Sequence, residues 1–239
     1  MVEAWAHRGA SGHAPENTLA AFRRAIDLGA DGVELDVQLC GDREMVVIHD
    51  ETVERTTDGT GWVKDLPFDV IRGFDASAGW EGFAGERVPT LREVFELLAP
   101  TRLKINVEIK DSVIPYYGLG EKVSELVDEF GLEQRVTLSS FNHCSLAWLR
   151  QNGSMVRTGV LFSDVLFEPW NYAAQIWATA LHPDFHYVDY VFNLIDEAHI
   201  ALLDVNVWTV NEPGDIDRMI GRGVDAIITD FPERVLERR

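Results

Sequence analysis

Acidic and imidazole side chains lie on two neighbouring strand-like segments near the N-terminus. Residues of the segment Gly32–Leu39 alternate in character, so that Glu34 and Asp36 share one face. The segment Met45–Ile48 follows and is succeeded by His49. The two segments are separated by only five residues, too few for a parallel crossover, so we expect an antiparallel hairpin with Asp36 opposite His49. Two carboxylates beside an imidazole could hold a divalent cation next to a proton-transfer group.

Charged side chains also stand at the ends of two other strand-like segments. His7 and Arg8 follow the first apolar run of the chain, and Glu108 and Lys110 lie at the end of the segment Leu103–Ile109. Glu108 would add a third carboxylate to the two of the hairpin. Such oxygen ligands suit Mg²⁺ or Ca²⁺, whereas Zn²⁺ more often takes nitrogen and sulfur. The sequence therefore predicts a divalent cation, Mg²⁺ or Ca²⁺, held by these three carboxylates.

Each of the remaining charged residues has a predicted role. Imidazole titrates near neutral pH, so His7 and His49 are the candidate acid–base pair. Arg8 and Lys110 would bind the substrate and neutralise the negative charge that builds on one of its oxygens. The alternative is that the acids and these two bases form a structural network of ion pairs. We favour catalysis, because isolated charges inside the mouth of a barrel need compensation at high cost.

Four weaker candidates complete the predicted site. Glu16 and Asn17 precede a helix that begins near Leu19, and Asn17 could either cap that helix or support the active site. Phe141 and Trp208 lie at the ends of later strand-like segments. Each of these two aromatic residues could line a substrate pocket or belong to the core, and the sequence leaves both interpretations open.

The elements that must position these residues alternate along most of the chain. Parallel strands are expected to start near residues 3, 31, 103, 135, 155, 185, 203 and 225, each followed by a helix except where the hairpin intervenes. The seventh is expected at Phe185–Tyr190, after a helix near Asn171–Leu181. Eight such units predict an α/β fold, a (β/α)8 TIM-like barrel. The alternative, an open doubly wound sheet, lacks a glycine-rich dinucleotide or phosphate loop after the first strand.

One stretch departs from this alternation. Residues 51–87 are rich in Gly, Asp and Thr and contain no long periodic segment. Long irregular stretches in a compact domain usually serve function. We therefore expect a single domain over residues 1–239, with residues 51–89 as a small inserted subdomain over one end of the fold, after the second strand and its hairpin.

Composition narrows the class of protein. The chain has 239 residues, 46% of them hydrophobic, which is enough for a large core. Its net charge of −19 argues against nucleic acid or an anionic membrane as a partner, since both favour clustered Lys and Arg. Two cysteines suggest no disulfide framework, and the chain shows neither a signal-peptide pattern nor an apolar stretch of membrane-spanning length. We expect a soluble, cytoplasmic protein with a small-molecule partner.

An ordered set of motifs runs through nearly the whole chain. It comprises AHRGASGHAPENTLAAF, DGVELDVQL, VVIHDETVERTTDGTG, AGERVPTLREVF, NVEIK, TLSSF, VNVWTVN and GVDAIITDFP. This set resembles the glycerophosphodiester phosphodiesterase family. The resemblance implies a TIM-like barrel with a small insertion after the second strand. It also implies metal-assisted hydrolysis of glycerophosphodiesters to sn-glycerol 3-phosphate and an alcohol.

The resemblance further implies roles for individual residues. The family's paired histidines fall on His7 and His49, its metal carboxylates on Glu34, Asp36 and Glu108, its phosphate contacts on Arg8 and Lys110, and its Glu-Asn pair on Glu16 and Asn17. Which histidine is the base, and whether water or the neighbouring glycerol hydroxyl attacks, stays open. The alternatives are a relative that acts on longer lipids, such as a lysophospholipase D, and a non-catalytic binding protein on the same barrel.

Overall fold

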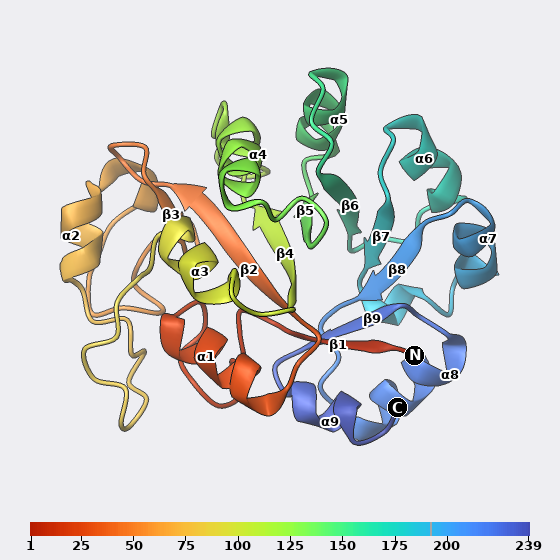
Figure 1. Cartoon of the computed structure of the whole chain (residues 1–239), viewed down its shortest axis with the longest axis horizontal. Helices are drawn as coiled ribbons and strands as arrows, with labels where there is room; N and C mark the ends of the chain where they lie inside the picture. Colours follow the sequence, from red (N-terminus) through yellow and green to blue (C-terminus); the bar gives the residue numbers. More distant parts are fainter. Residues whose placement is uncertain (192) are drawn as a thin grey trace.

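The computed structural model describes residues 1–191 and 193–239. Across these residues, eight parallel strands close into a ring surrounded by helices, and a ninth strand lies outside the ring (Figure 1). The ring strands are β1 (Glu3–Ala6), β2 (Gly32–Leu39), β4 (Lys104–Ile109), β5 (Val136–Ser140), β6 (Arg157–Phe162), β7 (Ala180–Pro183), β8 (Asp204–Val207) and β9 (Ala226–Thr229). Pairing of β1 with both β2 and β9 closes the ring. The (β/α)8 barrel expected from the sequence is confirmed.

Strand β2 illustrates how the barrel sorts its side chains. All of its residues are buried. Val33 and Leu35 pack in an apolar cluster with side chains of the surrounding helices. Glu34 and Asp36 alternate with them and therefore face the barrel interior, because successive side chains of a strand point to opposite faces. The alternation thus brings acidic groups to the inside of a barrel whose outer face is apolar.

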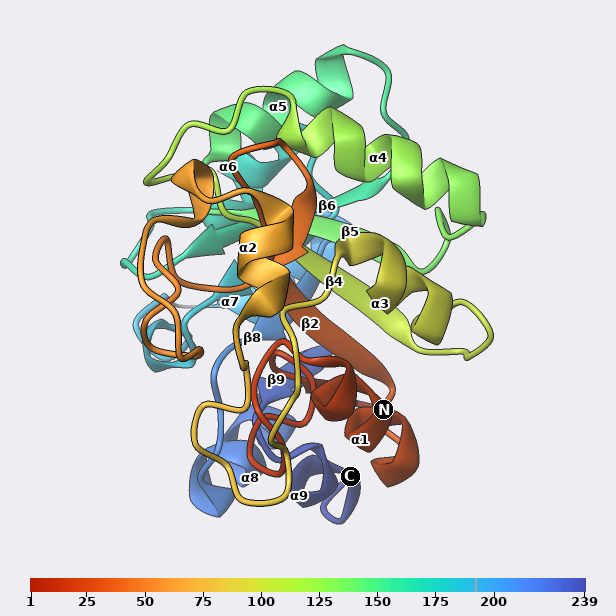
Figure 2. The same cartoon turned by 90° about the vertical axis from the view of Figure 1, so that its left-hand side faces the viewer.

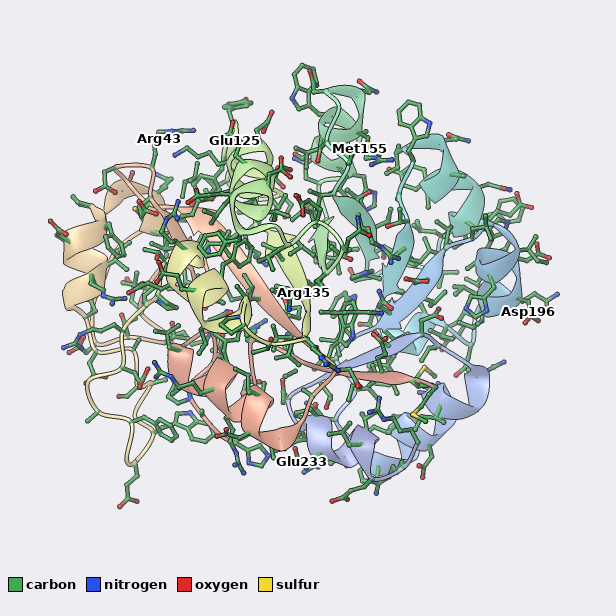
Figure 3. All side chains as sticks on the ribbon, in the orientation of Figure 1. Arg43, Glu125, Arg135, Met155, Asp196 and Glu233 are labelled. Carbon is green, nitrogen blue, oxygen red and sulfur yellow. The ribbon has the colours of Figure 1, made fainter. Side chains whose placement is uncertain are left out.

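Helices cover the outside of the ring. They are α1 (Leu19–Leu28), α3 (Leu91–Leu98), α4 (Leu119–Phe130), α5 (His143–Gln151), α6 (Pro169–Gln175), α7 (Leu194–Ile200), α8 (Pro213–Arg222) and α9 (Pro232–Leu236). Their outer faces carry charge, as Glu125 on α4 and Asp196 on α7 illustrate (Figure 3). None of the helices in the described part of the chain is long and apolar enough to cross a membrane.

The insertion lies on the side of the barrel that carries β2 (Figures 1 and 2). It begins after β3 (Met45–Val47), which pairs antiparallel with β2 as expected, and contains a short 3₁₀ helix, η1 (Val63–Asp65), and α2 (Phe68–Gly73). A separate small apolar cluster holds it together, with Val53, Val63 and Ile71 among its fully buried members.

Two expectations about strands are wrong. The hairpin register pairs Val37 with Val47, which places Ile48, and not His49, opposite Asp36. The turn is centred on Asp42 and not between Asp42 and Arg43, because Arg43 adopts a left-handed conformation with φ 67° and its N–H donates to the carbonyl of Cys40.

The seventh strand was also misplaced. It is β7, at Ala180–Pro183, which overlaps only the end of the helix expected near Asn171–Leu181, while Phe185–Tyr187 forms a 3₁₀ helix, η2. The four strand residues are all buried and include the polar His182. A four-residue segment that contains a histidine shows little alternation of polar and apolar residues. The more apolar stretch Phe185–Tyr190 therefore resembles a strand more closely in the sequence.

Candidate active site

Three carboxylates meet inside the barrel mouth. Strands β2 and β4 pair in parallel with Asp36 beside Glu108, and this register sets Glu34 two residues back on the same face. Ligand oxygens of all three lie within 4.8 Å of one another. The side chains of Glu34 and Asp36 are buried, and that of Glu108 is largely buried. The structure thus brings together the three acids expected to hold a cation.

Burial and mutual repulsion disfavour the ionised forms of Glu34 and Glu108 in this cluster. Burial, followed by repulsion from Asp36 and Glu108, raises the pKa of Glu34 well above its usual value. Burial and the charge of Asp36 raise the pKa of Glu108 to about 7, against the opposing effect of Lys110. A cation between the three groups would relieve this repulsion. The donor set, all carboxylate oxygen, fits Mg²⁺ or Ca²⁺.

Asp36 is the acid that stays ionised. Burial alone would raise its pKa, but Arg8, His49 and Lys110 together with a hydrogen bond from Asn17 lower it. Its Oδ1 is buried and finds no hydrogen-bond partner among the described residues. This buried carboxylate oxygen is free of hydrogen bonds in the described part of the chain, with Nζ of Lys110 3.9 Å away, and so is available to coordinate a cation.

Each candidate histidine is held by an aspartate. Nδ1 of His7 lies 2.7 Å from Oδ1 of Asp230, and Nδ1 of His49 lies 2.6 Å from Oδ1 of Asp50. A carboxylate can only accept, so both Nδ1 atoms carry a proton and donate it. The opposite nitrogen, Nε2, is then the one that can exchange a proton, and that of His7 lies 4.0 Å from Oε2 of Glu34.

Asp230 remains charged beside its histidine. Burial by itself would raise the pKa of Asp230, but the hydrogen bond and charge of His7, with further hydrogen bonds from Asn211 and Ser11, lower it to about 2. The aspartate is therefore ionised across the physiological range. It fixes the imidazole tautomer in the way expected of a group that orients a general acid or base.

Both bases contact the acids. The backbone N–H of Arg8 donates to Oε2 of Glu34 at 2.9 Å, and Nε of its guanidinium lies 3.3 Å from Oδ2 of Asp36. Nζ of Lys110 lies 2.9 Å from Oε1 of Glu108 and 3.9 Å from Asp36. Opposing the effect of burial, the neighbouring carboxylates raise the pKa of both bases. The ion pairs that a purely structural network would make are thus present, and they involve the same carboxylates that would hold a cation.

Glu16 and Asn17 also belong to this cluster. Oε1 of Glu16 accepts a hydrogen bond of 2.8 Å from Nη1 of Arg8. Nδ2 of Asn17 donates to Oδ2 of Asp36 at 2.9 Å. Helix α1 is capped by Thr18, whose hydroxyl accepts from the N–H of Ala21. Helix capping, one of the two roles considered for Asn17, is therefore wrong, because Thr18 is the N-cap of α1.

A pocket opens beside the histidines and acids. The space between its walls, part of it open to solvent, is about 460 Å³. It is lined by His7, Arg8, Glu34, His49, Asn106, Glu108, Phe141, Leu161, Trp208, Thr209 and Ile228. The rings of Phe141 and Trp208 meet edge to face with centroids 5.7 Å apart. Both aromatic residues thus line the pocket, which was one of the two positions that the sequence left open for them.

Sequence reasoning gave no role to several residues that the structure places here. Asp230 directly follows the last strand, and Asp50 and Arg55 follow His49 in the sequence. Their positions at a strand end and in the insertion were the sequence features that could have indicated a role in the site. Asn106 lies one alternation before Glu108 on β4. It donates to Ser139 at 2.9 Å, while its Oδ1 has no partner in the described ranges.

Comparison with known proteins agrees with this geometry. The model of the glycerophosphoryl diester phosphodiesterase family matches residues 7–234. The chain belongs to this family. It is 46% identical to a glycerophosphodiester phosphodiesterase from Caldanaerobacter subterraneus subsp. tengcongensis, over 97% of this chain and 95% of the relative. The enzyme class expected from the motifs is confirmed.

Solved structures of the family share the fold. A glycerophosphodiester phosphodiesterase from Agrobacterium tumefaciens is 29% identical and has a TM-score of 0.86, covering 99% of this chain and 100% of that one. A phosphodiesterase from Oleispira antarctica, solved with the product sn-glycerol-3-phosphate, has a TM-score of 0.86 and 29% identity, covering 98% of this chain and 95% of that one. This family member therefore has a barrel closely similar to that of a relative with a bound glycerol phosphate.

Proposed function

We propose that this phosphodiesterase hydrolyses glycerophosphodiesters to sn-glycerol 3-phosphate and an alcohol through its two histidines. The observation that carries the proposal is one pocket lined by His7, His49 and the carboxylates of Glu34 and Glu108, with an aspartate on Nδ1 of each imidazole. A non-catalytic binding protein would have no use for two oriented proton-transfer groups facing one cavity.

Glu34, Asp36 and Glu108 would hold a divalent cation, Mg²⁺ or Ca²⁺. When bound, such an ion supplies Lewis-acid stabilisation of charge on phosphate oxygens. Lys110 keeps Glu108 in place from the other side, at 2.9 Å. Arg8 lines the pocket beside these acids and binds a phosphate oxygen through its guanidinium.

The two histidines divide the proton transfers. We assign the base to His7, because its Nε2 lies nearer the carboxylate cluster, 4.0 Å from Glu34. Nε2 of His7 takes the proton of the attacking oxygen, water or the neighbouring glycerol hydroxyl, as that oxygen bonds to phosphorus. His49 gives a proton to the oxygen of the departing alcohol as its bond to phosphorus breaks. When the glycerol hydroxyl attacks, a water molecule then opens the cyclic phosphate with the histidine roles reversed.

Phe141 and Trp208 would hold the apolar part of the substrate at the pocket wall. Residues 51–89 would act as an inserted subdomain of one domain spanning 1–239, since their small apolar cluster is separate from those of the barrel. The two cysteines, Cys40 and Cys144, are unpaired, which fits a reducing compartment such as the cytoplasm.

The test is release of alcohol from a panel of glycerophosphodiesters with choline, ethanolamine, glycerol or inositol as the alcohol. We expect turnover with Mg²⁺ or Ca²⁺ and its loss in EDTA, restored by excess cation. Turnover that persists unchanged after exhaustive chelation would remove the cation from the proposal. Purified, folded protein that releases no alcohol from any member of the panel would overturn the proposal itself.

A further inference from the structure

Arg55 joins two carboxylates from separate parts of the chain. Its Nε and Nη2 donate to Oδ2 and Oδ1 of Asp50 at 2.6 and 2.9 Å. Its Nη1 and Nη2 donate to Oε2 and Oε1 of Glu16 at 2.6 and 2.9 Å. Glu16 precedes α1, whereas Asp50 and Arg55 follow β3. One guanidinium thus clamps two segments with four hydrogen bonds.

Both carboxylates hold a residue of the candidate active site. Oδ1 of Asp50 accepts from Nδ1 of His49 at 2.6 Å, and Oε1 of Glu16 accepts from Nη1 of Arg8 at 2.8 Å. Arg8 in turn lies 3.3 Å from Oδ2 of the buried Asp36. The contacts form a chain of alternating charge whose order is Asp36, Arg8, Glu16, Arg55, Asp50 and His49. It begins at a candidate cation ligand and ends at a candidate proton-transfer group.

Arg55 keeps the two carboxylates ionised. Its hydrogen bonds are the largest cause that lowers the pKa of Asp50, ahead of the contact with His49. Burial would raise the pKa of Glu16, but hydrogen bonds and charge from Arg55 and Arg8 lower it. A lysine could supply the charge, but its ammonium cannot span both carboxylates with paired hydrogen bonds.

We infer that Arg55 is a positioning residue of this active site, which sets the imidazole of His49 through Asp50 and the guanidinium of Arg8 through Glu16. Arg55 is not among the residues that line the pocket, so it acts only through these carboxylates. Through Arg55, the insertion helps to orient the side chains of Arg8 and His49. The role in turnover rests on the proposed function, whereas the role in orienting His49 does not.

The orientation is tested by the ¹⁵N spectrum of the His49 side chain, recorded above its titration range on metal-free protein and assigned with His49→Gln. The wild type should show a protonated Nδ1 and an unprotonated Nε2, because Nδ1 donates to Asp50. Arg55→Met should mix the two tautomers, and Arg55→Lys should mix them less. A spectrum of Arg55→Met that matches the wild type would overturn the inference.

Arg92 provides the matched control. Its guanidinium makes a bidentate pair with Glu129 at 2.6 and 2.7 Å, and its side chain is 47% exposed, as is that of Arg55. Arg92→Met should leave the His49 spectrum and turnover unchanged. If Arg92→Met alters the spectrum as much as Arg55→Met, the effect is a general loss of an ion pair and the inference is wrong.

Kinetics separate positioning from general structural damage. Arg55→Met should lower kcat on the order of tenfold to 10²-fold, the range for groups that orient reacting residues. In a Glu16→Gln/Asp50→Asn background the same substitution should cost little more, because both carboxylates are already gone. An equal loss in both backgrounds would contradict positioning through them. Wild-type protein without phosphodiesterase activity would refute the proposed function, and the His49 spectrum would still decide the role of Arg55.

Discussion

His7 and Asp230 meet at the seam where the barrel closes. Nδ1 of His7 lies 2.7 Å from Oδ1 of Asp230, although 223 residues separate them in the chain. Each follows directly on a strand, and β1 and β9 pair with Ala6 beside Thr229. The contact between the first and last strands therefore delivers an ionised carboxylate to a candidate catalytic imidazole.

Asp230→Asn should lower kcat on the order of 10²-fold, the scale of one acid–base group, because an amide can donate to Nδ1 and permit the wrong tautomer. Steady-state kinetics against the preferred diester measure the effect. Ser11→Ala is the control, since Ser11 Oγ also donates to Asp230, at 2.9 Å, without touching the imidazole. Equal losses in both variants would mean that the packing around Asp230 matters and not its contact with His7.

His7→Ala and His49→Ala should each lose roughly 10²-fold or more in kcat, because each removes one proton-transfer group. His199→Ala is a suitable control, as His199 pairs with Asp225 outside the pocket. Near-normal turnover by either of the first two variants would exclude that histidine from the mechanism.

A divalent cation should stabilise the folded protein. Binding to the native state alone adds about 2.7 kcal/mol when the cation is a hundredfold above its Kd. Mg²⁺ or Ca²⁺ should therefore raise the Tm of EDTA-treated protein in a concentration-dependent way. Glu34→Gln should show a much smaller rise, because it removes one of the three carboxylates. Equal Tm rises in the two proteins would place the cation elsewhere.

His182 should make stability sensitive to acid. It is fully buried in β7, and burial, with the nearby charge of Arg157, lowers its pKa to about 3. The unfolded chain takes up this proton near pH 6.5, so the folded state loses relative stability as pH falls below that value. Between pH 7 and pH 5 the loss from this group is about 2 kcal/mol.

Urea unfolding at the two pH values measures this contribution. His182→Gln should remove that part of the pH dependence, since glutamine does not titrate and its amide oxygen can still accept from Asn206, which donates to His182 at 3.0 Å. His199→Gln, at an exposed histidine, should keep the wild-type dependence. If His182→Gln and wild type lose stability equally between pH 7 and pH 5, the buried imidazole is not responsible.

The sequence by itself determined the repeating units and the direction of side chains within each strand. Glu34 and Asp36 had to share a face because a strand has a period of two, and the placement of charged residues at strand ends pointed to one edge of the sheet. The motifs determined the family. These are local or ordered properties, and each can be read along the chain without knowing what lies beside it.

Only the tertiary structure determined which side chains contact one another in the site. The carboxylates that hold His7 and His49, and the clamp of Arg55 on Glu16 and Asp50, depend on which segments lie side by side. The hairpin register depended on one left-handed residue, Arg43, and the position of β7 on burial of a short polar strand. A hydrogen bond between distant residues exists only once ring closure fixes both in space, and no spacing along the chain encodes that closure.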